Sequence, residues 1–159
     1  MHTHQIKWLW LSILAGAAVA GCEGLAVTLP DGLTLGYHIV SITVTNTTDY
    51  YVDPRIYADD DDNTFFDSNI VTNENYVDTG VIPPYTSVTV TLNCDQAGTI
   101  KSDYAILELP GADWVESDNA PKVTDDNDFD CGDSIEFIFI DTGVEFFTRV
   151  EINGRFIED

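Results

Sequence analysis

Apolar and polar residues alternate along several short stretches of the chain, a pattern typical of β-strands with one buried and one solvent-facing side. The clearest stretches are residues 38–45 and 87–92. Their inward positions are His38, Val40, Ile42, Val44, Val88, Val90 and Leu92. Residues 50–58 and 104–109 predict two further strands. Pro54 cannot donate a ladder hydrogen bond, so it predicts a sheet edge or a bulge within 50–58.

The C-terminal part of the chain predicts a β-hairpin. Residues 134–140 and 144–152 flank the turn sequence Asp141-Thr142-Gly143, and Asn153-Gly154 offers a second tight turn before 155–157. Short strands are also expected at 64–66 and 76–79, and no stretch has sustained helical periodicity. The pattern therefore predicts an all-β fold, an antiparallel β-sandwich of immunoglobulin-like type with seven or eight strands.

A long acidic segment, residues 112–131, interrupts this pattern. Loops of such length are uncommon in compact domains, so it either contains a short strand near Trp114-Val115 or has a function of its own. Trp114 and Phe129 lie within it. Aromatic side chains in loops are either exposed binding anchors or plugs that cover a small core, and the sequence leaves both interpretations open.

The composition is strongly acidic, with 28 Asp and Glu against 6 Lys and Arg among 159 residues and a net charge of -22. A hydrophobic content of 44% with 11% aromatic residues is too high for a disordered acidic tail, so the charge belongs to the surface of one folded domain. Nucleic acids and anionic lipid surfaces require a basic patch, which this composition does not favour. Neither is therefore expected to bind the folded part.

The first residues have the layout of an export signal. A polar segment, residues 1–7, precedes an uncharged and mostly apolar run, residues 8–20, which is shorter than the ~20 residues that a transmembrane helix requires. The run ends in Val19-Ala20-Gly21-Cys22, which resembles the lipobox of bacterial lipoproteins. The alternative is an ordinary secretory signal cut after one of the small residues in 15–21.

The lipobox resemblance implies cleavage before Cys22, a diacylglyceryl thioether on that cysteine and an N-acyl chain such as palmitate, which together anchor a protein stably in a membrane. Glu23 follows the cysteine where some bacterial lipoproteins carry an Asp that retains them in the inner membrane, so the outer membrane is favoured. The expected organisation is a signal peptide over 1–21, a lipid-anchored tether over 22–36 and a β-sandwich domain over 37–159. Cleavage would remove Lys7 and no carboxylate, which leaves a net charge of -23.

Two motifs resemble those of known envelope proteins. The segments 44–48 and 82–88 are similar to the strand and turn pattern of bacterial immunoglobulin-like modules. The segments 94–98 and 131–133 resemble small acidic envelope lipoproteins of unknown function. These resemblances imply a fold and a location, and they carry no activity with them.

Cys94 and Cys131 are the only cysteines besides Cys22. An oxidising compartment outside the cytoplasm favours a disulfide between them. Two free buried thiols are the alternative. A zinc site is disfavoured because His38 is the only histidine outside the predicted signal peptide and no CxxC motif occurs.

The chain lacks the sequence motifs of serine hydrolases, zinc proteases and P-loop enzymes. His38 is predicted to have a structural role on the inward face of its strand. An envelope hydrolase that uses a carboxylate pair is a remote alternative, because carboxylates are so abundant here that finding a pair has no diagnostic value. No enzymatic activity is expected.

Calcium is the one ligand that the acidic runs suggest, since this cation prefers clustered oxygen ligands on loops. Two runs, 59–63 and 125–130, have the D-x-[DN]-x-[DN] spacing, and neither completes an EF-hand. The candidate ligands are Asp59, Asp61, Asn63, Asp126, Asp128 and Asp130. The competing interpretation is that these are solvated loops that keep the protein soluble.

The sequence therefore predicts a lipid-anchored module of the cell envelope, without enzymatic activity, that binds a protein or glycan partner or has a structural role. A calcium-binding surface adhesion module is the alternative.

Overall fold

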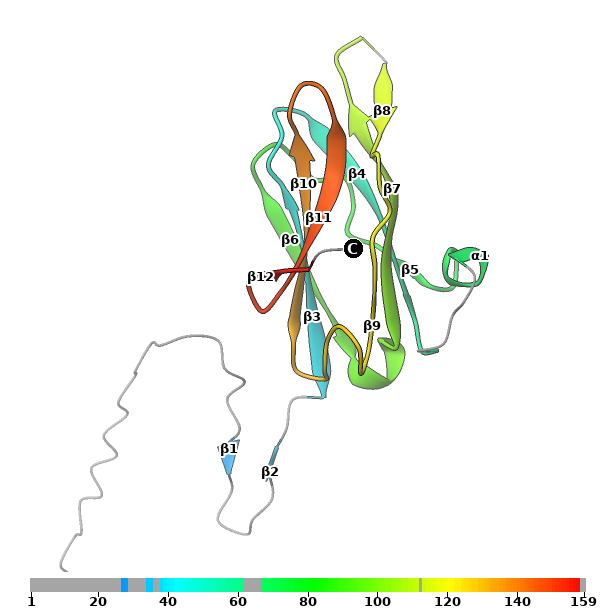
Figure 1. Ribbon diagram of the computed structural model, residues 1–159, viewed down its shortest axis with the longest axis vertical. Coiled ribbons are helices and arrows are strands. Elements are labelled where there is room, and N and C mark those ends of the chain that lie inside the picture. Colours follow the sequence, from blue (N-terminus) through cyan, green and yellow to red (C-terminus); the bar gives the residue numbers. More distant parts are fainter. Residues whose placement is uncertain (1–26, 29–33, 36–37, 62–66, 112, 158–159) are drawn as a thin grey trace, which may run out of the picture.

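Two β-sheets packed face to face form the body of the protein (Figure 1), which confirms the predicted all-β sandwich. The computed structural model describes residues 27–28, 34–35, 38–61, 67–111 and 113–157.

The first sheet has the strand order β12-β11-β10-β3-β6, and the second has the order β5-β4-β7-β8, with β9 also paired to β7. The first sheet comprises β3 (Ile39–Asn46), β6 (Ser87–Asn93), β10 (Ser134–Asp141), β11 (Phe146–Ile152) and β12 (Arg155–Phe156). The second comprises β4 (Tyr51–Asp59), β5 (Tyr76–Val77), β7 (Thr99–Glu108), β8 (Trp114–Glu116) and β9 (Lys122–Thr124).

Three short elements lie outside these sheets. β1 (Val27–Thr28) and β2 (Thr34–Leu35) pair as a two-stranded antiparallel ladder. One helical turn, α1 (Asp67–Ile70), follows β4, and the 3-10 turn η1 (Cys94–Gln96) follows β6. Neither of these helical segments of the described chain is long and apolar enough to span a membrane.

Among the described residues the two sheets contain ten strands rather than seven or eight. The additional strands are short: β8 corresponds to one of the two interpretations of the acidic segment, and β9, three residues long, leaves no readable alternation in the sequence. The first sheet is also mixed, because β3 and β10 run parallel while its other pairs are antiparallel. This parallel pairing of β3 with β10 depends on contacts between parts of the chain that are distant in the sequence.

β3, β4, β6 and β7 alternate between the two sheets along the chain, whereas β10 and β11 follow each other in the first sheet. β3 and β6 pair in one sheet and β4 and β7 pair in the other, so the connections cross the sandwich as they do in immunoglobulin-like folds. β3 begins at the lower end of the molecule in Figure 1, where η1 also lies, and β8 projects at the upper end. We call these the disulfide end and the β8 end.

The core fills the space between the sheets. Inward residues of the long strands are fully buried, among them Ile42, Val52, Ile56, Phe137 and Phe139. The predicted inward residues of β6 are only half-buried. This follows from the position of β6 at the edge of its sheet, where one side of each inward side chain has no neighbouring strand.

The prediction that Pro54 disturbs the ladder of its strand is confirmed. Asp53 pairs with Ile106 and Arg55 with Asp103, so Pro54 lies opposite two residues of β7, Tyr104 and Ala105, in a β-bulge whose extra residue belongs to β7. β4 lies between β5 and β7 and is not an edge strand, so the bulge is what accommodates the missing donor.

The acidic segment 112–131 is structured. It contains the short strand expected near Trp114 and also β9, which the sequence pattern did not predict. Between them the backbone N–H of Asp118 donates to Phe146 O at 2.7 Å, and the Asn119 amide exchanges two 2.7 Å hydrogen bonds with the backbone of Thr148. Since Phe146 and Thr148 belong to β11, this segment joins the second sheet to the first and closes one side of the sandwich.

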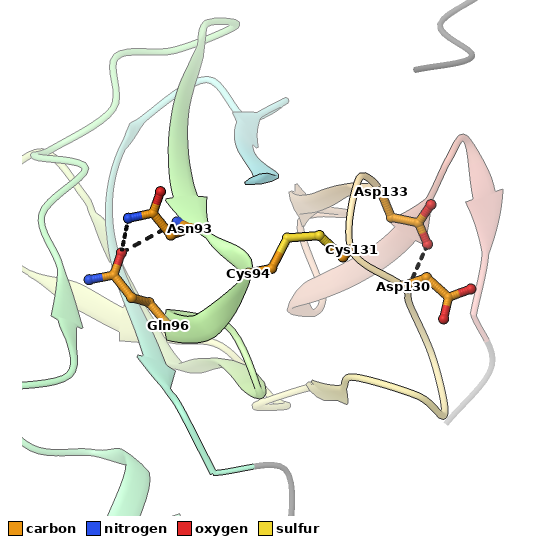
Figure 2. Close-up of a disulfide and its surroundings, with 6 residues drawn as sticks. All are labelled: Asn93, Cys94, Gln96, Asp130, Cys131 and Asp133. Atoms are coloured by element: carbon orange, nitrogen blue, oxygen red, sulfur yellow. Dashed lines mark hydrogen bonds between the residues drawn. A yellow bond between two sulfur atoms is a disulfide. The ribbon is translucent and has the colours of Figure 1, made fainter. Parts of the chain in front are cut away.

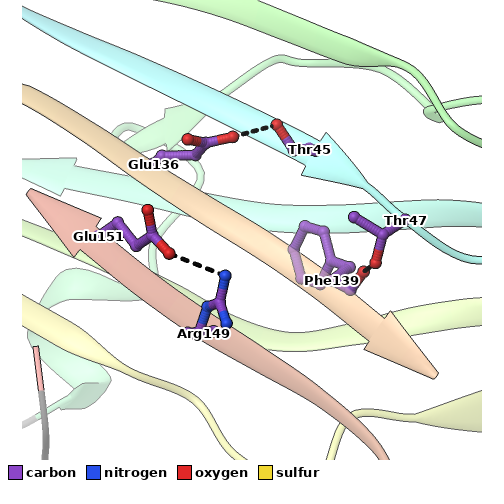
Figure 3. Close-up of polar contacts among 6 residues, drawn as sticks. All are labelled: Thr45, Thr47, Glu136, Phe139, Arg149 and Glu151. Carbon is purple, nitrogen blue, oxygen red and sulfur yellow. Dashed lines mark hydrogen bonds and ion pairs between the residues drawn. The ribbon is translucent and has the colours of Figure 1, made fainter. Parts of the chain in front are cut away.

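Polar contacts on the outer face of the first sheet link β3 and the residue after it to β10, and also link two residues within β11 (Figure 3). The Thr45 hydroxyl donates to Glu136 Oε1 at 2.5 Å, and Arg149 forms an ion pair with Glu151 at 2.8 Å. The Thr47 hydroxyl donates to the backbone carbonyl of Phe139. Cross-strand contacts such as that between Thr45 and Glu136 add to the pairing of β3 with β10.

Several predictions fall outside the described residues. The signal peptide over 1–21, the lipidation site Cys22 and the short strand at 64–66 all lie there. Of the tether over 22–36, only the two strands β1 and β2 are described.

Candidate functional site

The disulfide end is built around the bond between Cys94 and Cys131, whose Cα atoms are 5.5 Å apart (Figure 2). This confirms the predicted pairing. Cys94 follows β6 and Cys131 precedes β10, and these strands flank β3 on its two sides. The Cys94 N–H donates to His38 O and the Gly132 N–H to Ile39 O, both at 3.1 Å. The bridge therefore fixes the point at which the chain enters the sandwich.

Local hydrogen bonds shape the two loops that carry the cysteines. The Gln96 side-chain oxygen accepts from the backbone and side-chain nitrogens of Asn93, at 3.3 and 3.1 Å. The backbone N–H of Asp130 donates to the Asp133 carboxylate at 2.8 Å (Figure 2). These contacts order both loops independently of the disulfide.

The two acidic runs meet at this end through their backbones. The Thr99 hydroxyl donates to Asp61 O at 2.7 Å, and the Asp125 N–H donates to Gly98 O at 2.8 Å. A Cβ placed on Gly98 would lie 2.6 Å from Asp60 O, so only glycine allows this close approach. The two runs thus both pack against the backbone at Gly98. Nothing in the sequence pattern indicated this role.

The carboxylates that gather come from one run alone. Oxygens of Asp125, Asp126 and Asp130 lie within 4.8 Å of one another, with Asp125 half-buried and the other two exposed. Asp125 was not among the six predicted ligands. It joins the group because the backbone folds back here, with Asp126 N–H bonded to Phe129 O at 3.1 Å.

The remaining predicted ligands have other contacts or lie elsewhere. Asp128 accepts from the backbone N–H and the hydroxyl of Thr124, at 2.8 and 3.2 Å. Asp59 accepts from Asn75 Nδ2 at 2.5 Å and from the Asp61 N–H at 3.0 Å. Neither Asp59 nor Asp61 belongs to the carboxylate group found among the described residues. Asn63 lies outside those residues.

His38 is exposed and precedes β3, which begins at Ile39. The prediction that it faces inward is therefore wrong, because the buried alternation of this strand begins only at Val40. His38 lines a shallow hollow of about 380 Å³ together with Asn93, Cys94 and Asp95. Cys94 is oxidised in the disulfide, so its sulfur is not available as a thiol nucleophile.

The two aromatic residues of the acidic segment have opposite environments. Phe129 is only 3% exposed and belongs to the core, so it is a plug, whereas Trp114 is 60% exposed. Trp114 borders a second hollow of about 330 Å³ at the β8 end, whose other lining residues are Ile106, Glu108, Leu109 and Asp113. An exposed indole, two apolar side chains and two carboxylates thus line the same hollow.

Two tyrosines have a perturbed acidity. Burial, with the added charges of Asp53 and Asp78, raises the pKa of the Tyr76 hydroxyl. The hydrogen bond that the Tyr85 hydroxyl donates to Asp49 raises the pKa of Tyr85. Both shifts favour the neutral phenol, which gives neither group the character of a base at neutral pH.

The comparisons with known proteins do not establish a family. No family model and no curated protein matches the chain. Among solved structures, one described as a Gram-negative toxin aligns with a TM-score of 0.43 and 12% identity, over 74% of this chain and 24% of that one. Pneumolysin aligns with a TM-score of 0.43 and 9% identity, over 76% of this chain and 25% of its own. The chain thus matches only about a quarter of the length of either toxin, and this likeness carries no functional argument.

Proposed function

We propose that this protein is a lipid-anchored module of the bacterial cell envelope, favoured to be in the outer membrane, and that its role is binding or structural rather than enzymatic. The N-terminal apolar run and the sequence Val19-Ala20-Gly21-Cys22 support export and lipidation. The acidic composition supports a soluble domain that anionic headgroups repel and that an acyl anchor holds at the membrane.

The cysteine arrangement is the observation on which this proposal rests. The chain has three cysteines, and Cys94 and Cys131 are joined to each other. Cys22 is then left over for acylation, in a protein whose disulfide is typical of compartments outside the cytoplasm. The entry of the chain at the disulfide end is consistent with a tether that leads from Cys22 to His38.

Two features of the described residues favour a binding or structural role over an enzymatic one. His38, the histidine left after the proposed cleavage, lies on the surface beside a disulfide rather than beside a nucleophile. The hollow at Trp114 contains carboxylates and apolar groups, which suits recognition better than acid–base chemistry. A hydrolase based on a carboxylate pair stays a remote alternative.

Lipid anchorage is tested by mass spectrometry of the N-terminal peptide from membrane fractions, with Cys22→Ser as the variant. We expect the native peptide to begin at Cys22 and to carry acyl chains, and the variant to remain unprocessed or to leave the membrane fraction. Cys94→Ser is the matched control, because it also removes one sulfur and leaves the lipobox intact. An unmodified N-terminus at any other residue would contradict the proposal.

Calcium binding at the disulfide end is a second candidate function. It is favoured by one observation, the approach of the Asp125, Asp126 and Asp130 oxygens to within 4.8 Å. Three carboxylates form about half of a calcium shell, which usually has 6–8 oxygen ligands. The alternative is that these carboxylates only solvate the loop.

The calcium candidate predicts a rise in melting temperature that sodium and magnesium at matched ionic strength do not reproduce. The double variant Asp126→Asn, Asp130→Asn should abolish the rise. The double variant Glu74→Gln, Asp95→Asn, which removes the same charge from exposed positions elsewhere, should retain it. An equal effect of all three salts would leave these carboxylates as a solubilising surface.

A further inference from the structure

The outer face of β7 and β8 carries two rows of side chains at the β8 end. Residues directly opposite each other in antiparallel strands project from the same face of a sheet. Tyr51, Glu108 and Trp114 form one such row across β4, β7 and β8. Val52 and Leu107, the next pair along, are buried between the sheets, so the row faces outward.

The second outward row consists of Asp53, Ile106 and Glu116. With adjacent strands about 4.8 Å apart, Tyr51 and Trp114 lie about 10 Å apart with Glu108 between them. Their side chains are 51% and 60% exposed. Two exposed aromatic rings therefore flank a carboxylate on a regular, rigid surface.

The charge of this surface selects its ligand. Glu108 and Asp113 line the hollow beside Trp114, and no basic residue is among its lining residues. The whole chain carries 28 acidic against 6 basic side chains, so an anionic ligand that approaches this surface is repelled. A cation instead gains from the carboxylates and from the face of the indole. A neutral sugar would pack against the indole ring but would gain little electrostatic attraction from the carboxylates.

The backbone of β8 offers a second means of recognition. β8 is the last strand of its sheet. The Leu109 N–H donates to Asp113 O at 3.0 Å and the Ser117 N–H donates to Ala105 O at 2.9 Å. Because bonded and non-bonded pairs alternate in an antiparallel ladder, the backbone groups of Trp114 and Glu116 point away from β7. An extended segment can add to this edge as a further strand.

The position of this edge suits contact with a partner. The chain enters the sandwich at the disulfide end, and β8 projects at the opposite end (Figure 1). An anchored domain would thus present β8 away from the membrane surface.

From these observations we propose that β8 and the hollow at Trp114 bind an extended basic peptide segment of another protein, which adds to the free edge of β8 and places an ammonium or guanidinium group between Trp114, Glu108 and Asp113. The proposal specifies the partner class of the binding role proposed above and rests on it for its biological setting. The binding chemistry itself does not require the lipid anchor.

The test uses the full chain with Trp8→Phe and Trp10→Phe, so that Trp114 is the only tryptophan and its fluorescence reports on this site. The probe is a short capped peptide of alternating lysine and threonine, titrated at physiological ionic strength. We expect saturable binding with a shift in Trp114 emission, and calorimetry with the unsubstituted chain should give the same affinity. A glutamate–threonine peptide should not bind.

Two test variants, two control variants and one modified peptide distinguish specific docking from general attraction between opposite charges. Trp114→Ala and Glu108→Gln should each weaken binding by about tenfold, measured by calorimetry. Phe156→Ala and Asp95→Asn are the matched controls, because they remove an exposed aromatic ring and a carboxylate from other places, and they should leave the affinity unchanged. N-methylation of alternate backbone nitrogens in the probe should weaken binding to a similar extent.

Several results would overturn the proposal. These are no binding of the lysine probe, equal weakening by the test and control variants, equal affinity of the N-methylated probe, or binding of a neutral oligosaccharide in place of the peptide. Membrane fractionation of the same preparations measures anchorage separately. A failure of peptide binding by an acylated protein would therefore reject this inference and leave the proposed anchored module intact.

Discussion

Single buried polar side chains hold together parts of this protein that are distant in the sequence. Asn46 is fully buried at the end of β3. Its Nδ2 donates to Tyr50 O at 2.7 Å, to Ile82 O at 3.0 Å and to Pro83 O at 3.1 Å, while its Oδ1 accepts from the Thr48 N–H at 2.9 Å. One amide thus joins β3, the start of β4 and the loop that leads into β6.

Replacing Asn46 by alanine should lower the free energy of unfolding by about 3 kcal/mol, because four hydrogen bonds would be lost at once and the buried Thr48 N–H would lose its acceptor. Urea denaturation measures this change. Asn127→Ala is the matched control, since Asn127 is exposed and makes one 3.2 Å hydrogen bond, and it should cost less than about 1 kcal/mol. Equal losses in the two variants would contradict the assigned role of Asn46.

At the scale of elements, the connection between η1 and β7 is a packing point. Gly98 is buried, and the backbones of both acidic runs approach it, Asp60 and Asp61 from one side and Asp125 from the other. The second run contains Phe129, whose phenyl ring is buried in the core. This run is therefore held both by an apolar side chain and by the backbone hydrogen bond from Asp125 to Gly98. The acidic character of these runs therefore coexists with tight packing.

Gly98→Ala should destabilise the protein by about 1–3 kcal/mol, because its Cβ would meet the Asp60 carbonyl oxygen at 2.6 Å and backbone must move to relieve the clash. Thermal unfolding of the variant measures the loss. Asp95→Ala, an exposed substitution in the same connection, should change stability by less than about 0.5 kcal/mol. A variant at Gly98 with native stability would show that the two runs do not pack as described.

At the scale of the whole molecule, one covalent bond and a large excess of negative charge act in opposite directions. The disulfide joins positions separated by 37 residues. It restricts the unfolded chain, while a net charge of -22 favours expansion through repulsion. The stability of the folded state depends on both effects, in addition to the hydrophobic core between the sheets.

Removing the disulfide by Cys94→Ala, Cys131→Ala should lower the free energy of unfolding by up to about 4 kcal/mol, the loop-entropy value for a loop of this length. Urea denaturation under non-reducing conditions measures the difference. The unsubstituted protein treated with a reductant should approach the variant. Identical stability of the oxidised and reduced proteins would contradict this account.

Sodium chloride should stabilise the protein, because screening shortens the range of the repulsion among its carboxylates. Raising ionic strength from about 0.01 to 0.15 M shortens the Debye length from about 30 to 8 Å. We expect a higher melting temperature in salt. Sucrose at matched osmolality is the control for general solute effects, and a melting temperature independent of salt would show that the carboxylates are too far apart to repel.

Much of the architecture was predictable from local pattern. The alternation in residues 38–45 predicted the buried face of β3, where Val40, Ile42 and Val44 are buried because β3 has a neighbouring strand on both sides. Pro54 predicted its bulge through the missing N–H, and the turn residues predicted the β10–β11 hairpin. The pairing of Cys94 with Cys131 followed from there being no other partner outside the lipobox.

The candidate sites were predictable only in part. The sequence indicated which runs carry carboxylates, yet Asp125 rather than Asp128 completes the group at the disulfide end, because the turn after β9 bonds Asp128 to Thr124. Trp114 and Phe129 were equivalent in the sequence and lie in opposite environments, one on an edge strand and one in the core.

The sequence by itself therefore determined the all-β class, the long strands, the turn positions, the acidic surface and the cysteine pair. These depend on the chemistry of neighbouring residues. The tertiary structure decided the parallel pairing of β3 with β10, the short ladder β9, the convergence at Gly98 and the hollow at Trp114. Each of these depends on which distant strands become neighbours, and the alternation of residues along one strand carries no information about its partner.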